Sequence, residues 1–285
     1  MKSKLLLVLF VTLTRLQATP CVPFETSMNT LVKQLPTENK DWQLLSSLYK
    51  DYCNSERPTD TYIIPKMIHL IWLGSPMPEE CKLTLVSWEK FHPDWVVKVW
   101  TDADTASFPF INREAFDRAQ NFGEKSDIWR YEILYRYGGL YVDTDFECLQ
   151  PFDFLHRSCE FYTGVGQNVN PQLWIGLIGS VSGHPILKAT IDNLRTSLAD
   201  HNYERIMSET GAYLFTRMFL AVAPQCKRAT VVPFPVTFFY PFPGGERHRK
   251  DVQNIKREFL CPESMAIHYF ATSWQRDHLP QSPNK

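Results

Sequence analysis

The chain has 285 residues, of which 44% are hydrophobic, 30 are basic and 31 are acidic. This length suits one large domain with a full core. The net charge of -1 excludes the overall basicity that favours nucleic acid or an anionic membrane surface, so we expect no nucleic-acid partner.

The amino-terminal residues have the pattern of a signal peptide. Two lysines precede a largely apolar run over 5–13, and Ala18 supplies a small residue. Residues 1–18 therefore predict an exported chain or one in the secretory pathway. We expect no stable transmembrane span, because a span needs about 20 apolar residues and Arg15 interrupts this run. A short signal anchor in a Golgi-type membrane is the alternative.

Seven cysteines show no CxxC or zinc-ligand spacing; they stand at positions 21, 53, 81, 148, 159, 226 and 261. In an exported chain they can form disulfides, with at least one left over from the odd count. The connectivity stays open, and buried thiols are the alternative.

Residues 24–57 carry apolar side chains at helical spacing in two runs, separated by Pro36. They predict a helical extension packed on a main domain over 62–276, with a tail over 277–285.

The main domain begins with a strand over 67–73, a helix over 78–91 and a strand over 95–100. This order predicts a βαβ unit, which places ligands at the carboxyl ends of its strands. Further helices are expected at 112–120, 126–137, 186–198 and 203–220. Further strands or edges are expected at 140–142, 161–165, 173–179, 231–235, 238–241 and 266–270.

Asp127 and Arg130 stand three residues apart on the predicted helix 126–137, so they project from neighbouring points of one face. Both residues are expected in the first turn of this helix, where backbone N–H groups and the helix dipole favour anions. A guanidinium suits a phosphate or a pair of sugar hydroxyls. A surface ion pair is the alternative.

The same helix is expected to end at Gly138 and Gly139, since glycine readily takes the C′ conformation. Strand 140–142 then delivers Asp143 and Asp145, which alternation places on one side. Two such carboxylates repel unless a cation compensates, and their oxygens suit Mg²⁺ or Mn²⁺ together with a diphosphate. A surface turn is the alternative.

Three further residues are candidates for the same site. His268 lies in the apolar run 266–270 and is either a third metal ligand or a satisfied core histidine. Trp72 and Trp274 are either core aromatics or flat faces for a base or sugar ring.

Three stretches together resemble glycosyltransferase family 32, whose sugar-binding region contains the DXD motif. They are IPKMIHLIWLG (64–74), SDIWRYEILYRYGGLYVDTD (126–145) and IHYFATSW (267–274). The family includes fungal Golgi and inositol-phosphoceramide mannosyltransferases, and the clostridial glucosylating toxins look like distant relatives. The resemblance implies an α/β fold of GT-A type, a Rossmann-like mixed sheet flanked by helices.

The resemblance also implies a donor site. Trp72 would stack on the nucleotide base and Trp274 would close over the diphosphate. Asp127 and Arg130 would hold the donor sugar and its phosphate, and Asp143 would contact the ribose and the sugar.

The implied metal site has Asp145 as its main ligand, with His268 and Asp143 completing it. Mn²⁺ or Mg²⁺ bound there would bridge the diphosphate of the nucleotide sugar.

The implied function is metal-dependent, retaining transfer of a hexose from a UDP- or GDP-linked sugar to a hydroxyl of a glycan, glycolipid or protein acceptor. Front-face transfer is expected, because no carboxylate is an evident nucleophile. Ala212 replaces a common proline and segment 161–180 matches loosely, which leaves the acceptor open.

Two other classes compete. A haloacid-dehalogenase-type phosphatase also carries an Asp-x-Asp strand, but it has Thr or Val where this chain has Glu147. A catalytically silent sugar-nucleotide-binding effector is the non-enzymatic alternative.

Overall fold

The computed structural model describes residues 21–56, 60–119, 121–195 and 203–271. The predicted signal peptide 1–18, the tail 277–285 and Trp274 lie outside these ranges. Among the described helices, none is both long and apolar enough to cross a membrane.

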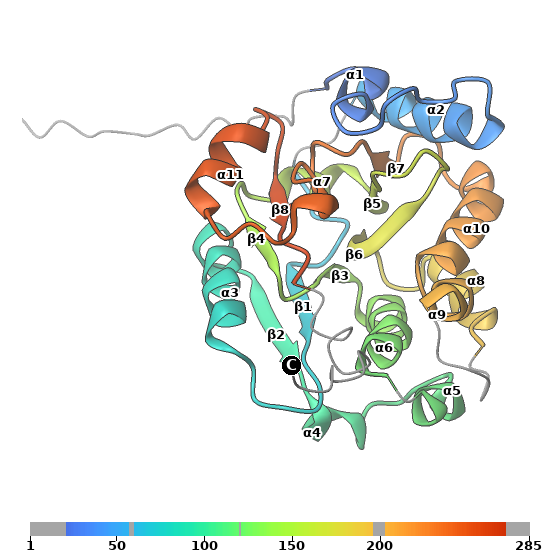
Figure 1. The fold of residues 1–285 in the computed structure, drawn as a ribbon. Coiled ribbons are helices and arrows are strands. Elements are labelled where there is room, and N and C mark those ends of the chain that lie inside the picture. The colour runs from blue at the N-terminus through green and yellow to red at the C-terminus, as the bar shows by residue number, and fades with distance from the viewer. Residues whose placement is uncertain (1–20, 57–59, 120, 196–202, 272–285) are drawn as a thin grey trace, which may run out of the picture.

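A six-stranded mixed sheet forms the centre of the molecule (Figure 1), as expected for the predicted α/β class. Its parallel half is the predicted βαβ unit together with the strand before the Asp-x-Asp motif. The sixth strand in the chain, β6, runs antiparallel to both of its neighbours, and the edge strand β7 is parallel to β5. In spatial order the strands are β2 (Val96–Trp100), β1 (Met67–Ile71), β3 (Gly139–Val142), β6 (Leu173–Ser180), β5 (Phe161–Val165) and β7 (Val231–Phe234).

A second, two-stranded sheet joins two distant parts of the chain. Strand β4 (Phe146–Cys148) pairs antiparallel with β8 (Ala266–His268), so that Phe146 is opposite His268. This pairing brings the C-terminal segment against the end of the Asp-x-Asp motif.

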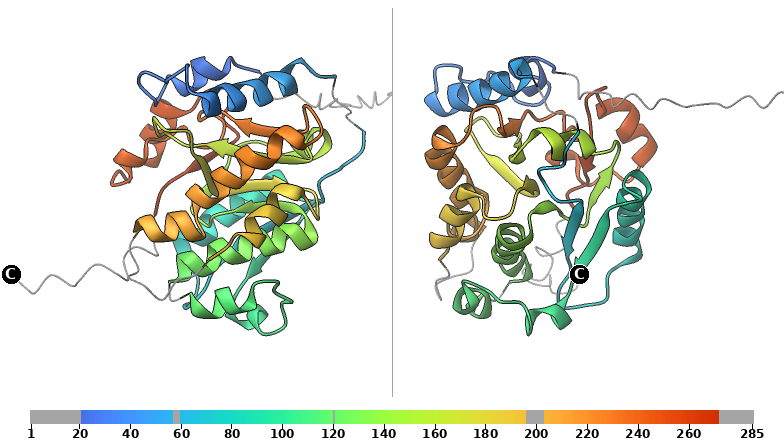
Figure 2. Two further views of the ribbon diagram at one scale, coloured as in Figure 1. Left: turned by 90° about the vertical axis from the view of Figure 1, so that its right-hand side faces the viewer. Right: turned by 180° about the vertical axis from the view of Figure 1, so that it is seen from behind.

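Helices surround the sheet, as Figures 1 and 2 show. Helix α6 packs on β1, β3 and β6, and α10 packs on β6. Helix α8 lies against both α6 and α10, while α3 packs on β4. The helices of the main body are α3 (Glu79–Phe91), α4 (Asp102–Thr105), α5 (Arg113–Arg118), α6 (Phe122–Tyr137), α7 (Asp153–Ser158), α8 (Pro185–Asp192), α9 (Tyr203–Glu209), α10 (Ala212–Val222) and α11 (Val252–Phe259).

The element order was largely predicted, but several boundaries were wrong. The helix expected over 186–198 ends at Asp192, and no strand forms over 238–241. Helix α6 begins four residues earlier than expected, because the Asn121 side chain accepts hydrogen bonds from two N–H groups of its first turn. The helix expected over 203–220 is two helices separated at Gly211. The last strand ends at His268, and Phe270 then adopts a φ of 52°. Elements α4, β4, α7 and α11 were not predicted.

The expected glycine pair does end α6. Gly138 and Gly139 have φ of 64° and 99°, and a Cβ on Gly139 would lie 2.7 Å from the Met67 carbonyl oxygen. Side chains are therefore excluded where β3 begins.

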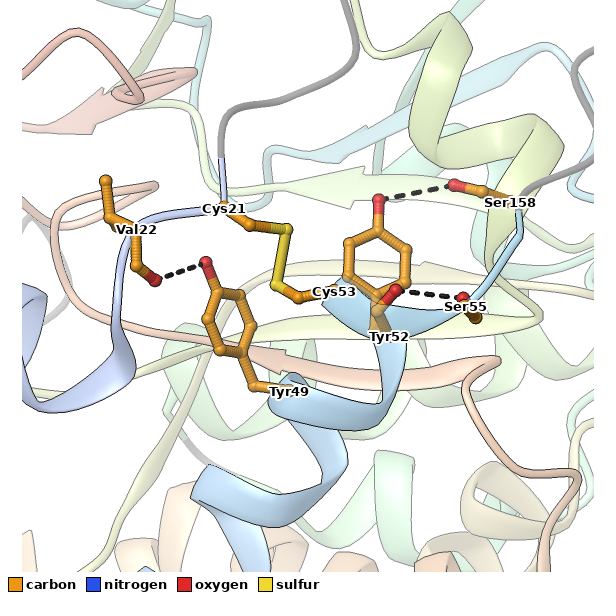
Figure 3. The surroundings of a disulfide bond; sticks show 7 residues. All are labelled: Cys21, Val22, Tyr49, Tyr52, Cys53, Ser55 and Ser158. Carbon is orange, nitrogen blue, oxygen red and sulfur yellow. Dashed lines mark hydrogen bonds between the residues drawn. A yellow bond between two sulfur atoms is a disulfide. The ribbon is translucent and has the colours of Figure 1, made fainter.

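The amino-terminal region forms two helices, α1 (Phe24–Met28) and α2 (Lys40–Asn54), and α2 packs on β7. A disulfide between Cys21 and Cys53 joins them (Figure 3). Next to it, the Tyr49 hydroxyl donates to the Val22 carbonyl oxygen. The structure thus shows the pairing of two of the seven cysteines. The boundaries of the helical extension and of the main domain stay predictions.

We expect loss of this disulfide to destabilise the protein. It closes a loop of 32 residues, and in the chain-entropy account Cys53→Ser should lower the free energy of unfolding by about 2–4 kcal/mol. Urea denaturation of the oxidised protein measures the change. Cys226→Ser, at a half-buried thiol outside the disulfide, is the control. Equal effects of the two substitutions would contradict the expectation.

Candidate functional site

A cleft of about 860 Å³ opens where several strands of the sheet end. The carboxyl ends of β1 and β3 reach it, and so does the beginning of β6, because β6 runs antiparallel to β3. The cleft therefore lies at the edge where open α/β sheets bind ligands. Trp72, Asp127, Arg130, Asp143, Asp145 and His268 all line it.

Arg130 stands at the centre of a buried ion-pair network. Its Nη2 lies 2.9 Å from Asp127 Oδ1, and its Nη1 lies 3.0 Å from Asp143 Oδ1. Nη1 also donates to the Ile175 carbonyl oxygen, and Nε donates to that of Ser126. Three of the five guanidinium N–H groups thus donate hydrogen bonds to protein acceptors, and Nη2 contacts Asp127 as an ion pair. This arrangement makes Arg130 the group that positions both carboxylates.

The alternative to the Asp127–Arg130 prediction was wrong, and so was one detail of the prediction itself. The pair is not on the surface, since the residues are 8% and 5% exposed. Nor does it lie in the first turn of the helix, because α6 begins at Phe122. The helix dipole therefore contributes little there, since its effect falls off within one turn.

Burial shifts the ionisation of this pair. It raises the pKa of Asp127 to about 7, with Asp143 adding repulsion while Arg130 pulls the pKa down. Burial opposes the charge of Arg130, but Asp143, Tyr141 and Asp127 together raise its pKa above the usual value. Asp127 therefore depends on Arg130 to hold a negative charge.

Asp143, Asp145 and His268 form one cluster of potential metal ligands. One ligand atom from each lies within 4.8 Å of the others. The two aspartates flank a turn rather than sharing a strand, and their side chains are half-buried, so the surface-turn alternative is wrong. Two carboxylates and an imidazole fit a divalent cation.

The C-terminal segment holds Asp145 in place. His268 Nε2 lies 2.9 Å from Asp145 Oδ1, and the Ala271 N–H donates to Oδ2 at 2.7 Å. Burial works against the charge of Asp145, but His268 and the Ala271 N–H outweigh it and lower the pKa. The positive φ of Phe270 turns the chain between these two contacts.

His268 is not a satisfied core histidine. Its ring stacks on Phe146 with centroids 4.5 Å apart, and its buried Nδ1 has no hydrogen-bond partner among the described residues. The expected proximity to Asp145 is present, although 123 residues separate the two in sequence.

Trp72 lies just beyond β1 and is half-buried at the cleft, with its Nε1 donating to Ser75 Oγ. Its contact with a nucleotide base stays a prediction. Trp274 lies outside the described residues.

Tyr141 contacts both Asp143 and Arg130, a role that was not predicted from the sequence. Its hydroxyl donates to Asp143 Oδ1 at 2.8 Å, and the Arg130 guanidinium lies 4.6 Å from its ring centre. The signal was present, because Tyr141 stands two residues before Asp143 on the same strand face. The Ile175 carbonyl, by contrast, carries no signal in the sequence.

The mixed sheet and the acidic cluster at its edge define an α/β protein of GT-A type with a DXD motif. Residues 78–162 match the family described as "Glycosyltransferase sugar-binding region containing DXD motif". This match agrees with the resemblance found in the sequence and covers the Asp-x-Asp motif, and a family of this description implies a divalent metal and a nucleotide sugar.

Two curated relatives illustrate the similarity. Inositol phosphoceramide mannosyltransferase 2 of Schizosaccharomyces pombe is 32% identical over 159 residues, which cover 52% of this chain and 44% of that protein. Mannosyl phosphorylinositol ceramide synthase SUR1 of Saccharomyces cerevisiae is 28% identical over 162 residues, covering 52% and 39%. The chain thus spans less than half the length of each.

Among solved structures, the catalytic domain of alpha-toxin from Clostridium novyi is similar with a TM-score of 0.46 and 9% identity, over 85% of this chain and 83% of that one.

Proposed function

We propose that the protein is a metal-dependent, retaining glycosyltransferase that moves a hexose from a UDP- or GDP-linked sugar to a hydroxyl of a glycan, glycolipid or protein. The observation that carries the proposal is the cluster of Asp143, Asp145 and His268 beside Arg130 at the sheet edge. The matched family region contains both aspartates and Arg130.

The residues have separate tasks in this proposal. Asp145, His268 and Asp143 would hold the cation, which when bound offsets the negative charge on the departing diphosphate. Asp127 and Asp143 accept hydrogen bonds from the donor hydroxyls, in orientations that Arg130 maintains. Nε and Nη1 of Arg130 donate to acceptors within the protein, and only Nη2, which also pairs with Asp127, could reach the donor phosphate, so the main contribution of Arg130 is preorganisation of the two carboxylates.

Retention by front-face attack is supported by the carboxylates of the cleft. Among the described lining residues, only Asp127, Asp143 and Asp145 carry a carboxylate. Arg130 or His268 engages each of them, so none is placed as a nucleophile without a partner. The acceptor hydroxyl would attack on the side of the leaving group.

Passage through the secretory pathway is part of the proposal. The amino-terminal pattern of residues 1–18 predicts export, and the Cys21–Cys53 disulfide suits an oxidising compartment.

Donor binding and hydrolysis test the proposal. The protein is incubated with Mn²⁺ and each of several UDP- and GDP-hexoses, and its melting temperature and the release of free sugar are measured. We expect one donor to raise the melting temperature and to be hydrolysed slowly without acceptor. Binding without hydrolysis or transfer would indicate a silent effector, and turnover of generic phosphate esters with Mg²⁺ would indicate a phosphatase.

A further inference from the structure

The cleft has a second wall that the donor roles leave unused. The proposed donor residues come from the ends of β1 and β3, from α6 and from the C-terminal segment. This second wall is the beginning of β6 and the loop before it, with Gln172, Trp174 and Gly176. This wall lies outside the matched family region 78–162.

Strand β6 changes course at this wall. Its pairing with β5 shifts register between Thr163 and Gly164, and the Thr163 hydroxyl donates to the carbonyl oxygens of Trp174 and Leu177. Such irregularities re-aim side chains at functional sites. At Gly176 a Cβ would lie 2.8 Å from Asp143 Oδ2, so glycine keeps the space beside that carboxylate open.

Gln172 is a buried amide at this wall with an unused acceptor. It is 5% exposed, and its Oε1 has no hydrogen-bond partner among the described residues. Its backbone is held, because its carbonyl oxygen accepts from the Gly166 N–H at 2.8 Å and the next N–H, of Leu173, donates to Thr216 Oγ1. A buried polar group without a partner is costly, which points to a ligand that supplies one.

Trp174 lies beside it as a fixed aromatic surface. It is half-buried, with the rings of Tyr240 and Phe270 packed edge-to-face at 4.8 and 5.4 Å. Alternation along the strand turns Leu173 into the core and both Gln172 and Trp174 toward the cleft. A flat indole next to an amide suits a pyranose ring, which has apolar C–H faces and a rim of hydroxyls.

Hydrogen bonds of the Gln167 side chain hold the loop before β6 in place. Gln167 donates from Nε2 to the carbonyl oxygens of Tyr240 and Phe242 and accepts at Oε1 from the Gly244 N–H. The wall is therefore preformed, which lowers the entropic cost of binding.

We propose that Gln172 and Trp174 form an acceptor subsite that takes a hydroxyl-rich sugar ring. The ring stacks on Trp174, and one of its hydroxyls donates to Gln172 Oε1. This inference rests on the proposed glycosyl transfer and adds that the acceptor is a saccharide unit rather than a peptide hydroxyl.

The test uses the full exported chain with Mn²⁺ and the donor it hydrolyses. Acceptors are methyl α- and β-hexopyranosides of glucose, galactose and mannose, with a pool of serine- and threonine-containing peptides as the competing class. We expect at least one glycoside to accept sugar. Gln172→Met keeps the volume but loses the amide, and should raise the KM for that glycoside roughly tenfold and more than it raises the donor KM.

Two further variants separate recognition from packing. Trp174→Leu should raise the glycoside KM, and Trp174→Phe, which keeps an aromatic face, should restore part of the loss. Gln43→Met makes the same change at an exposed glutamine on α2, outside the cleft, and should leave both KM values unchanged.

Each of three outcomes would overturn the subsite. They are transfer to peptides alone, no transfer to any glycoside, and an unchanged glycoside KM in Gln172→Met. Wild-type protein that neither hydrolyses nor transfers any donor sugar would instead overturn the proposed function, and the subsite with it.

Discussion

Asp145→Asn should reduce sugar transfer by a factor on the order of 10²–10³ or more while the protein stays folded. Asparagine has nearly the same shape, so it can still accept the Ala271 N–H and face His268. It lacks the negative charge that a divalent cation requires of this ligand. Mn²⁺ titration by calorimetry should show weakened binding, and the melting temperature should lose its dependence on Mn²⁺.

Asp192→Asn is the matched control for this change. Asp192 forms an exposed pair with Lys188 at the end of α8, away from the cleft, and its substitution should leave transfer and Mn²⁺ binding unchanged. Full transfer activity in Asp145→Asn would refute the assignment of the metal site.

Arg130→Met should destabilise the protein by about 3–5 kcal/mol and abolish transfer, because it removes the cation shared by Asp127 and Asp143. Methionine fills part of the space but leaves buried carboxylates without a counter-ion. Urea denaturation at pH 7 measures the change. The free energy of unfolding of Arg130→Lys should lie between those of the wild type and Arg130→Met. A lysine keeps the positive charge but cannot bridge two carboxylates with a planar fork.

The destabilisation should depend on pH. Burial already raises the pKa of Asp127 to about 7, and losing Arg130 raises it further. In the variant the carboxyl is therefore protonated in the fold at pH 5, and the loss of stability should be smaller there than at pH 7.

Two controls sharpen the measurement. Asp127→Asn combined with Arg130→Met should recover part of the lost stability, as coupled residues do in a double-mutant cycle. Arg113→Met breaks an exposed pair with Asp117 and should cost less than about 1 kcal/mol. Equal stability of Arg130→Met and the wild type would show that the network is not what holds the carboxylates.

Local patterns predicted most of the elements. Apolar runs indicated β1, β2, β5 and β6, and the pair Gly138–Gly139 marked the end of α6 because a positive φ favours glycine there. The start of α6 was misplaced, since an Asn cap before Phe122 and Gly123 is a weak signal. The three-residue strand β4 was missed because it is stabilised by β8, more than 100 residues away.

The sequence by itself determined the two halves of the site that are local: Asp127 and Arg130 on one helix face, and Asp143 and Asp145 after a buried strand. These follow from helix and strand periodicity, which depends only on near neighbours.

Only the tertiary structure decided how those halves meet. The order and register of the strands bring the Ile175 carbonyl and Asp143 into contact with Arg130, bring His268 into contact with Asp145, and add Gln172 to the lining of the same cleft. Such pairings depend on how distant segments pack, and the resulting burial raises the pKa of Asp127 and leaves Gln172 Oε1 without a hydrogen-bond partner among the described residues. No periodicity in the chain encodes either outcome.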